Sequence, residues 1–258
     1  MMDLEICVDS VESAVAAEMG GAQRVELCSA LSEGGLTPSR GLIRAVRSHV
    51  SIGVYVMIRP RGGDFFYSQD ECNVMRDDIA CAAEAEANGV VLGLLTAGGE
   101  VDVERTSELV ALAHPMEVTF HRAFDMAHDL VAALEAVAAT GATRILTSGA
   151  AQSAMLGSKR VAGLVQAAAG RVRVMAGGKV RAENVRQIAQ ATGAQEFHAS
   201  LSTAVASPVT HRNRSLHLGA AGRDEYARHV VLARDVRKLR QAIDSIQTVV
   251  HDKTEARV

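Results

Sequence analysis

The chain has 258 residues, of which 48% are hydrophobic and 22% charged, as is typical of a globular protein with a sizeable core. Its net charge of -3 and scattered lysines and arginines argue against binding to nucleic acid or to an anionic membrane. Neither a basic leader nor an apolar run of about 18 residues occurs, so we expect a cytoplasmic protein with reduced cysteines.

Short apolar runs alternate with amphipathic helical stretches along most of the chain. The runs lie at 4–8, 24–28, 54–58, 90–95, 117–121, 144–147, 172–176 and 195–198. The helical stretches lie at 11–19, 39–49, 69–88, 102–113, 128–139, 153–169 and 182–192. Eight such runs that alternate with helices predict an α/β fold, a (β/α)8 or TIM barrel. A doubly wound sheet would have fewer strands and usually a G-x-G-x-x-G motif, which is absent.

The sequence predicts a single domain over residues 1–248 with a C-terminal extension. The extension consists of a loop at about 199–222 and a helix that ends at about 247, and residues 249–258 are expected to form a flexible tail. Ser68 and Glu71 have the spacing of a capping box at the start of the third helix. Glycines, among them Gly89, are expected to close several helices.

The first two predicted strands carry acids and thiols on one face. Glu5 and Cys7 share a face because strand side chains alternate, and Glu26 and Cys28 repeat this division. With the apolar faces packed on the helices, the barrel interior is unusually polar. It contains Glu5, Cys7, Glu26, Cys28, Tyr55, Met57, Arg59, Thr119, His121, Met175, Glu196 and His198. Buried acids need partners, so we expect them to meet Arg24, Arg59, a histidine or a bound cation, and a ligand-free ion-pair network is the simplest alternative.

Charged and glycine-rich segments follow several strands, at the rim where TIM barrels carry their sites. Arg59 and Arg61 bracket a proline before a glycine pair, and paired guanidinium groups suit a carboxylate or phosphate. Gly177 and Gly178 precede a helix start after the seventh strand, a common phosphate position in barrels. The predicted ligand-binding residues are Arg59, Arg61, Asp64, Arg122, Ser148, Gly177, Gly178, Arg181 and His198.

His121 ends the fifth predicted strand with charged neighbours. Arg122 and Asp125 follow it closely, and we expect them to set its tautomer and its pKa. The predicted catalytic residues are Glu5, Glu26, His121 and Asp125.

Several strings of this sequence resemble those of the CutC family, called copper homeostasis proteins. They are LEICVDS at 4–10, RVELC at 24–28, EGGLTPS at 33–39, IRPRGGDFFY at 58–67, VTFHRAFD at 118–125, ILTSG at 145–149, MAGG at 175–178, RAEN at 181–184 and RNRS at 212–215. The resemblance extends from Leu4 to about residue 226. It implies a cytoplasmic TIM barrel, usually oligomeric, with a role in copper handling. Val8 departs from relatives that have a denser cysteine-containing stretch there, which lowers the number of thiols.

In one functional hypothesis the protein binds copper. Cys7 and Cys28 are the predicted metal ligands, because soft thiolate donors select Cu(I), and adjacent strands are expected to place them at the same height. His121, Met57 or Met175 would assist them.

In the alternative hypothesis the barrel is an enzyme with lyase-like or isomerase-like acid–base chemistry. Its substrate would be a small anionic metabolite, including phosphorylated ones, held by the arginines. A third arrangement places a divalent cation among Glu5, Glu26 and His121.

The alanine-rich outer helices are compatible with a homodimer or a larger homo-oligomer.

Overall fold

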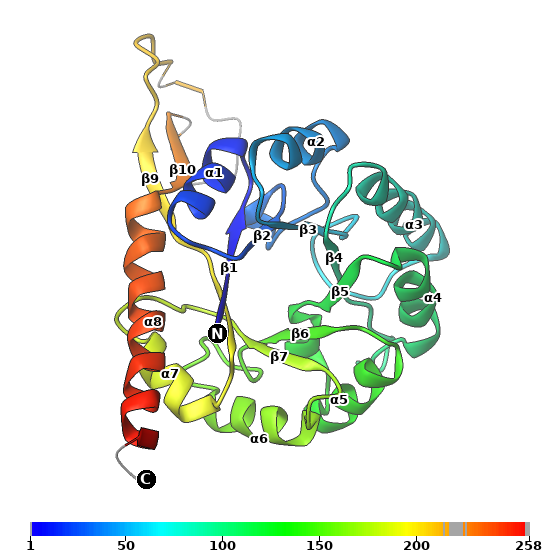
Figure 1. The fold of residues 1–258 in the computed structure, drawn as a ribbon. Helices are drawn as coiled ribbons and strands as arrows, with labels where there is room; N and C mark the ends of the chain where they lie inside the picture. Colours follow the sequence, from blue (N-terminus) through cyan, green and yellow to red (C-terminus); the bar gives the residue numbers. More distant parts are fainter. Residues whose placement is uncertain (1, 214, 217–223, 225, 256–258) are drawn as a thin grey trace.

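The computed structural model describes residues 2–213, 215–216, 224 and 226–255, and its centre is a closed barrel of parallel strands (Figure 1). The strands are β1 (Asp3–Val8), β2 (Arg24–Leu27), β3 (Gly53–Met57), β4 (Gly89–Leu92), β5 (Glu117–Phe120), β6 (Arg144–Thr147), β7 (Arg173–Ala176) and β8 (Glu196–Ala199). Strand β1 pairs with both β2 and β8, which closes the ring. The predicted TIM barrel is therefore confirmed.

Helices surround the barrel and follow its strands in turn (Figure 1). They are α1 (Val11–Met19), α2 (Arg40–His49), α3 (Gln69–Glu84), α4 (Val103–Ala113), α5 (Leu130–Ala139), α6 (Ser158–Ala168) and α7 (Val185–Thr192). The last helix, α8 (Ala233–Glu255), contacts α1 and α7 and completes this outer layer. Two short 3-10 segments, η1 (Leu31–Glu33) and η2 (Arg122–Met126), lie in the loops after β2 and β5. In the described part of the chain, no helix is long and apolar enough to cross a membrane.

The main core lies between the strands and the helices. Leu4, Ile6 and Val8 form the outward face of β1, and they are buried in the same apolar cluster as Ala14 and Ala17 of α1. The opposite, inward face of β1 carries the polar residues, as the alternation in the sequence predicts. At the start of α3, Ser68 and Glu71 form the predicted capping box.

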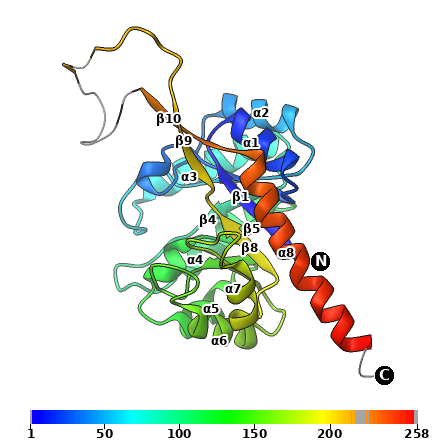
Figure 2. The same cartoon turned by 90° about the vertical axis from the view of Figure 1, so that its left-hand side faces the viewer.

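Three local predictions are wrong. The predicted loop at 199–222 contains β9 (Ser202–Ala206), which pairs antiparallel with β10 (Ala227–Val231) in a ribbon that projects from the barrel (Figure 2). Helix α8 continues to Glu255 because the sequence beyond 247 has no glycine or proline to stop it. Gly89 begins β4, since α3 already ends at Glu84. Arg214 of the RNRS string and residues 256–258 of the predicted tail lie outside the described residues.

Candidate functional site

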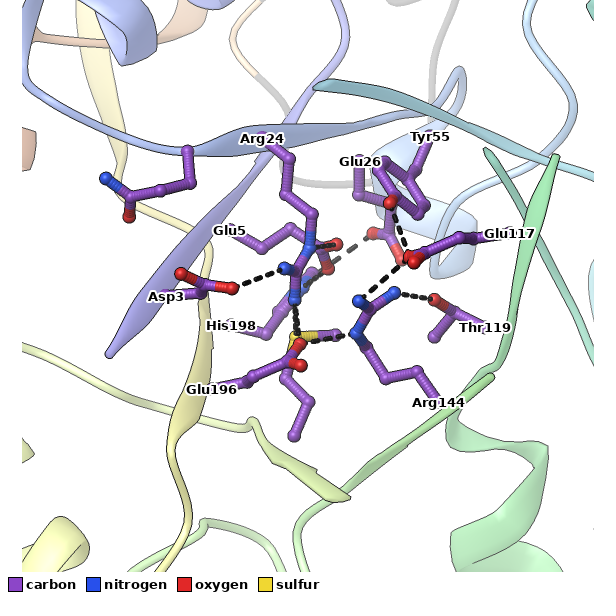
Figure 3. A network of polar contacts seen from close by, with 12 residues as sticks. Asp3, Glu5, Arg24, Glu26, Tyr55, Glu117, Thr119, Arg144, Glu196 and His198 are labelled. Atoms are coloured by element: carbon purple, nitrogen blue, oxygen red, sulfur yellow. Dashed lines mark hydrogen bonds and ion pairs between the residues drawn. The ribbon is translucent and has the colours of Figure 1, made fainter. Parts of the chain in front are cut away.

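Paired charges fill the barrel interior near the amino-terminal ends of the strands (Figure 3). Arg24 donates a hydrogen bond to Glu5 Oε2 at 2.7 Å and another to Glu196. Arg144 donates to Glu196 and, at 3.1 Å, to Glu117 Oε2. All these residues except Glu5 are the first residues of their strands, so they form one layer. Each buried charge has an opposite charge beside it, which offsets the cost of removing it from water.

Above this layer, two thiols, a carboxyl group and an imidazole lie together. Cys7 Sγ lies 3.9 Å from Cys28 Sγ, and Cys28 Sγ lies 3.6 Å from Glu26 Oε2. One ligand atom each from Cys7, Glu26 and His198 lie within 4.8 Å of one another, a spacing that a metal ion could bridge. Glu5 joins the two layers, because its Oε1 lies 2.7 Å from Nδ1 of His198. The predicted polar interior is therefore observed.

The strand register differs from the prediction that Cys7 and Cys28 stand at the same height. Cys7 aligns with Glu26 on the neighbouring strand, and Cys28 lies just beyond the end of β2. The two sulfur atoms meet along a diagonal because both side chains turn into the barrel. Leu31 of η1 packs against this thiol cluster from the loop above.

Burial and neighbouring charges shift the pKa values of these groups in opposite directions. Burial disfavours the charged form of Glu5, but Arg24 and His198 outweigh it and hold its pKa at about 2. Contact with Cys28 lowers the pKa of Cys7 to about 5, against the effect of burial and with help from His198. The charges of Glu26 and Glu5 and the contact with Cys7 raise the pKa of His198 despite burial. The structure thus favours a thiolate at Cys7 beside an imidazolium at His198.

The other two members of the cluster shift toward their neutral forms. Burial, followed by the charge of Cys7, raises the pKa of Glu26. The contact with Cys7 and burial raise the pKa of Cys28. Cys28 and Glu26 therefore release their protons less readily than a free thiol and a free carboxyl group, whereas Cys7 releases its proton more readily.

His121 has neighbours other than those the sequence predicts. Its Nδ1 accepts a hydrogen bond from the backbone N–H of Ala123 at 3.2 Å, and its ring centroid lies 5.0 Å from that of Phe65. Burial, together with the charge of Arg59, lowers the pKa of His121 to about 3, so the ring is neutral. Among the described residues, His121 does not join the group that could hold a metal ion, which consists of Cys7, Glu26 and His198.

Asp125 does not orient His121, and that expectation is wrong. Its carboxylate accepts hydrogen bonds from the Thr147 hydroxyl and the Ser148 amide, and it pairs with Arg122 at 2.8 Å. The turn of η2 directs this side chain toward the loop after β6. Asp125, Arg122 and Ser148 therefore form a cluster that fixes two loops together.

The side chains of Arg59 and Arg61 have different environments. Arg61 lies near the surface and bonds Glu71 and Asp64. Arg59 turns inward and is buried, and its terminal nitrogens donate to backbone carbonyl groups. Those carbonyls belong to Glu33, Gly35 and Gly63. Both arginines lie beyond the end of β3, in the loop that leads to α3.

The glycine-rich segment after β7 makes backbone bonds within the protein. The amide of Gly177 donates to the carbonyl of Thr147, and the carbonyl of Gly178 accepts from the amide of Ala154, each at 2.9 Å. Arg181 donates to the neighbouring backbone carbonyl. A phosphate role for Gly177, Gly178 and Arg181 stays a prediction.

Sequence reasoning missed Arg144 and Glu117 as members of the interior network. Arg144 is the largest fully buried side chain in the described part of the chain. Its signal in the sequence is a charged residue that opens an otherwise apolar run, as Arg24 does in β2. A charged residue in that place usually lies at a solvent-exposed strand end, so the pattern alone did not distinguish the two environments.

Comparison with known proteins assigns the chain to a family. Residues 2–203 match the model of the CutC family. Over 241 residues the chain is 51% identical to a family protein CutC of Chromobacterium violaceum, covering 93% of this chain and 98% of that one. It is 49% identical over 238 residues to the human copper homeostasis protein cutC homolog, with coverage of 92% and 86%. A crystal structure of CutC from Streptococcus agalactiae superposes with a TM-score of 0.73 at 36% identity, over 77% of this chain and 98% of that one. This chain belongs to the CutC family.

Proposed function

We propose that this protein binds one Cu(I) ion between Cys7 and Cys28, as part of copper homeostasis in the cytoplasm. The observation that carries this proposal is the 3.9 Å separation of two buried sulfur atoms inside the barrel. A thiolate–metal bond is about 2.3 Å long for zinc, so two thiolates that share an ion of similar size lie up to about 4.6 Å apart. The observed distance suits two-coordinate binding with a small adjustment of the side chains.

The chemistry of the donors favours a soft ion. Thiolate ligands select Cu(I) over hard cations such as Mg²⁺ or Ca²⁺, which prefer several oxygen ligands. A Cu(I) ion with two thiolates carries a net negative charge, and His198 beside them supplies a positive one. Related proteins are named for copper homeostasis, which agrees with this donor set.

Anaerobic titration with Cu(I) against a competing chelator tests the proposal. We expect binding of one ion per chain, and we expect Cys7→Ser and Cys28→Ser each to lower the affinity at least 100-fold, an order-of-magnitude figure for loss of one of two ligands. Cys81→Ser is the matched control, because Cys81 lies on α3 outside the barrel interior. Unchanged affinity in the Cys7 and Cys28 variants, with native circular dichroism, would remove the thiols from the site.

We also propose a homo-oligomer. Val131 and Met126 are large apolar side chains that are exposed near the start of α5 and the end of η2. A second subunit that covers them would remove apolar surface from water. Analytical ultracentrifugation gives the subunit number directly.

A further inference from the structure

Arg59 is a buried cation without a carboxylate partner in the described part of the chain. Arg59 is 5% exposed, and the other buried arginines are Arg24, Arg144 and Arg240. Arg24, Arg144 and Arg240 each form an ion pair with an acid. The hydrogen bonds of Arg59 go to neutral backbone carbonyls, and its Nε has no hydrogen-bond partner. A buried charge that lacks a counter-ion is costly, so the structure calls for a negative group beside it.

Two more buried donors without partners lie around Arg59. The hydroxyl of Tyr67 is buried beside the guanidinium group of Arg59, and its proton has no acceptor. Nε2 of His121 is also buried and unpaired. Phe65 lies between Arg59 and His121, with its ring 5.0 Å from Cζ of Arg59 and 5.0 Å from the ring of His121.

The hydrogen bond at the other ring nitrogen assigns the tautomer of His121. Nδ1 accepts the backbone N–H of Ala123, so it carries no proton. A neutral imidazole then has its proton on Nε2, which makes that atom a hydrogen-bond donor. Arg59 Nε, Tyr67 Oη and His121 Nε2 are thus three donors in need of acceptors.

We propose that Arg59, Tyr67 and His121 together bind a small oxyanion, a carboxylate or phosphate group, at the mouth of the barrel. Arg59 is the second residue after β3 and His121 the first after β5, so both lie at the carboxyl ends of their strands, where barrels bind their ligands. An oxyanion supplies both the missing negative charge and several acceptor oxygens, and charged hydrogen bonds of this kind are the strong ones. This site is separate in chemistry from the thiol pair, because none of its three groups is a thiol.

Isothermal titration calorimetry on metal-free protein tests the site with acetate and with inorganic phosphate as probes. We expect at least one probe to bind, and the better one distinguishes a carboxylate site from a phosphate site. Tyr67→Phe removes only the hydroxyl, and His121→Asn keeps an acceptor near Ala123 while removing the Nε2 donor. Each variant should weaken binding about 10- to 100-fold, the usual loss for one charged hydrogen bond.

The matched control is Tyr55→Phe. Tyr55 is also buried, but its hydroxyl donates to Glu117 at 2.6 Å, in the layer of paired charges near the amino-terminal ends of the strands. This variant should lower the thermal unfolding temperature and leave anion affinity unchanged. Tyr67→Phe should show the opposite pattern in anion-free buffer, with an equal or higher unfolding temperature, because it removes an unpaired buried hydroxyl.

Three results would overturn the proposal. The first is that neither probe binds at millimolar concentration. The second is that a probe binds equally well to the wild type and to both variants. The third is that Tyr67→Phe destabilises the anion-free protein as Tyr55→Phe does. The last result would mean that an ordered water or another structural partner satisfies the hydroxyl. None of these outcomes depends on copper, so they are distinguishable from a failure of the thiol site.

Discussion

Replacing Glu5 by glutamine measures how much the charged interior stabilises the fold. Glu5 is fully buried, and it lies 2.7 Å from Arg24 Nε and 2.7 Å from His198 Nδ1. These neighbours lower its pKa from 4.5 to about 2. Since a tenfold change in an equilibrium is about 1.4 kcal/mol, the ionised Glu5 contributes about 3 kcal/mol to the free energy of unfolding at neutral pH.

The sign of this contribution fixes its pH dependence. The folded pKa lies below the unfolded one, so the stabilisation is complete above pH 4.5 and disappears as the pH falls toward 2. Urea unfolding followed by circular dichroism should show Glu5→Gln less stable than the wild type by about 3 kcal/mol near pH 7. Near pH 3 the difference should shrink to less than half of that value, by an order-of-magnitude linkage estimate.

Glu117→Gln provides the control. The pKa of Glu117 is also lowered to about 2, by Tyr55, Arg173 and Arg144 against the effect of burial. Its side chain is 36% exposed, however, so solvent screening should limit the loss to about 1 kcal/mol. Equal losses in the two variants, or a loss at Glu5 that does not change with pH, would refute the claim that burial makes the Glu5 ion pairs strong.

Two further substitutions probe the interior by chemical or thermal unfolding. Arg144→Met leaves buried carboxylates without their cation and should cost about 3–5 kcal/mol, whereas Arg173→Met, at a side chain 45% exposed, should cost about 1 kcal/mol or less. Gly35→Ala should cost about 1–3 kcal/mol, because φ is +91° and the added Cβ would lie 3.0 Å from Cys28 Sγ. Gly170→Ala controls for backbone strain alone, since its φ is +78° and the Cβ meets no atom within 4 Å, so it should cost less than Gly35→Ala.

The barrel was predictable because its signals are local. Each strand is a short apolar run, and each helix has its own amphipathic pattern and caps, such as the box of Ser68 and Glu71. The ribbon of β9 and β10 was not predictable in the same way. The residues of β9 alternate between half-buried and exposed, and their backbone partners come from a segment more than twenty residues later in the chain.

The site was predictable in composition but not in pairing. Alternation within each strand is enough to place Glu5, Cys7, Glu26 and Cys28 inside the barrel. Which of them touch depends on the register between strands, which aligns Cys7 with Glu26. Contacts across the interior, such as that of Arg144 with an acid of β8, depend on the closure of the whole ring, and no short segment encodes them.

The two layers of the interior are coupled through Glu5. Its carboxylate bonds Arg24 below and His198 above, and His198 in turn lies against the thiol cluster. Loss of the Glu5 charge therefore removes one of the charges that favour the imidazolium form of His198. That imidazolium in turn helps to keep Cys7 ionised. Glu5→Gln should for this reason weaken Cu(I) binding at neutral pH, even though Glu5 is not a ligand, and the loss should be smaller than that of either cysteine substitution.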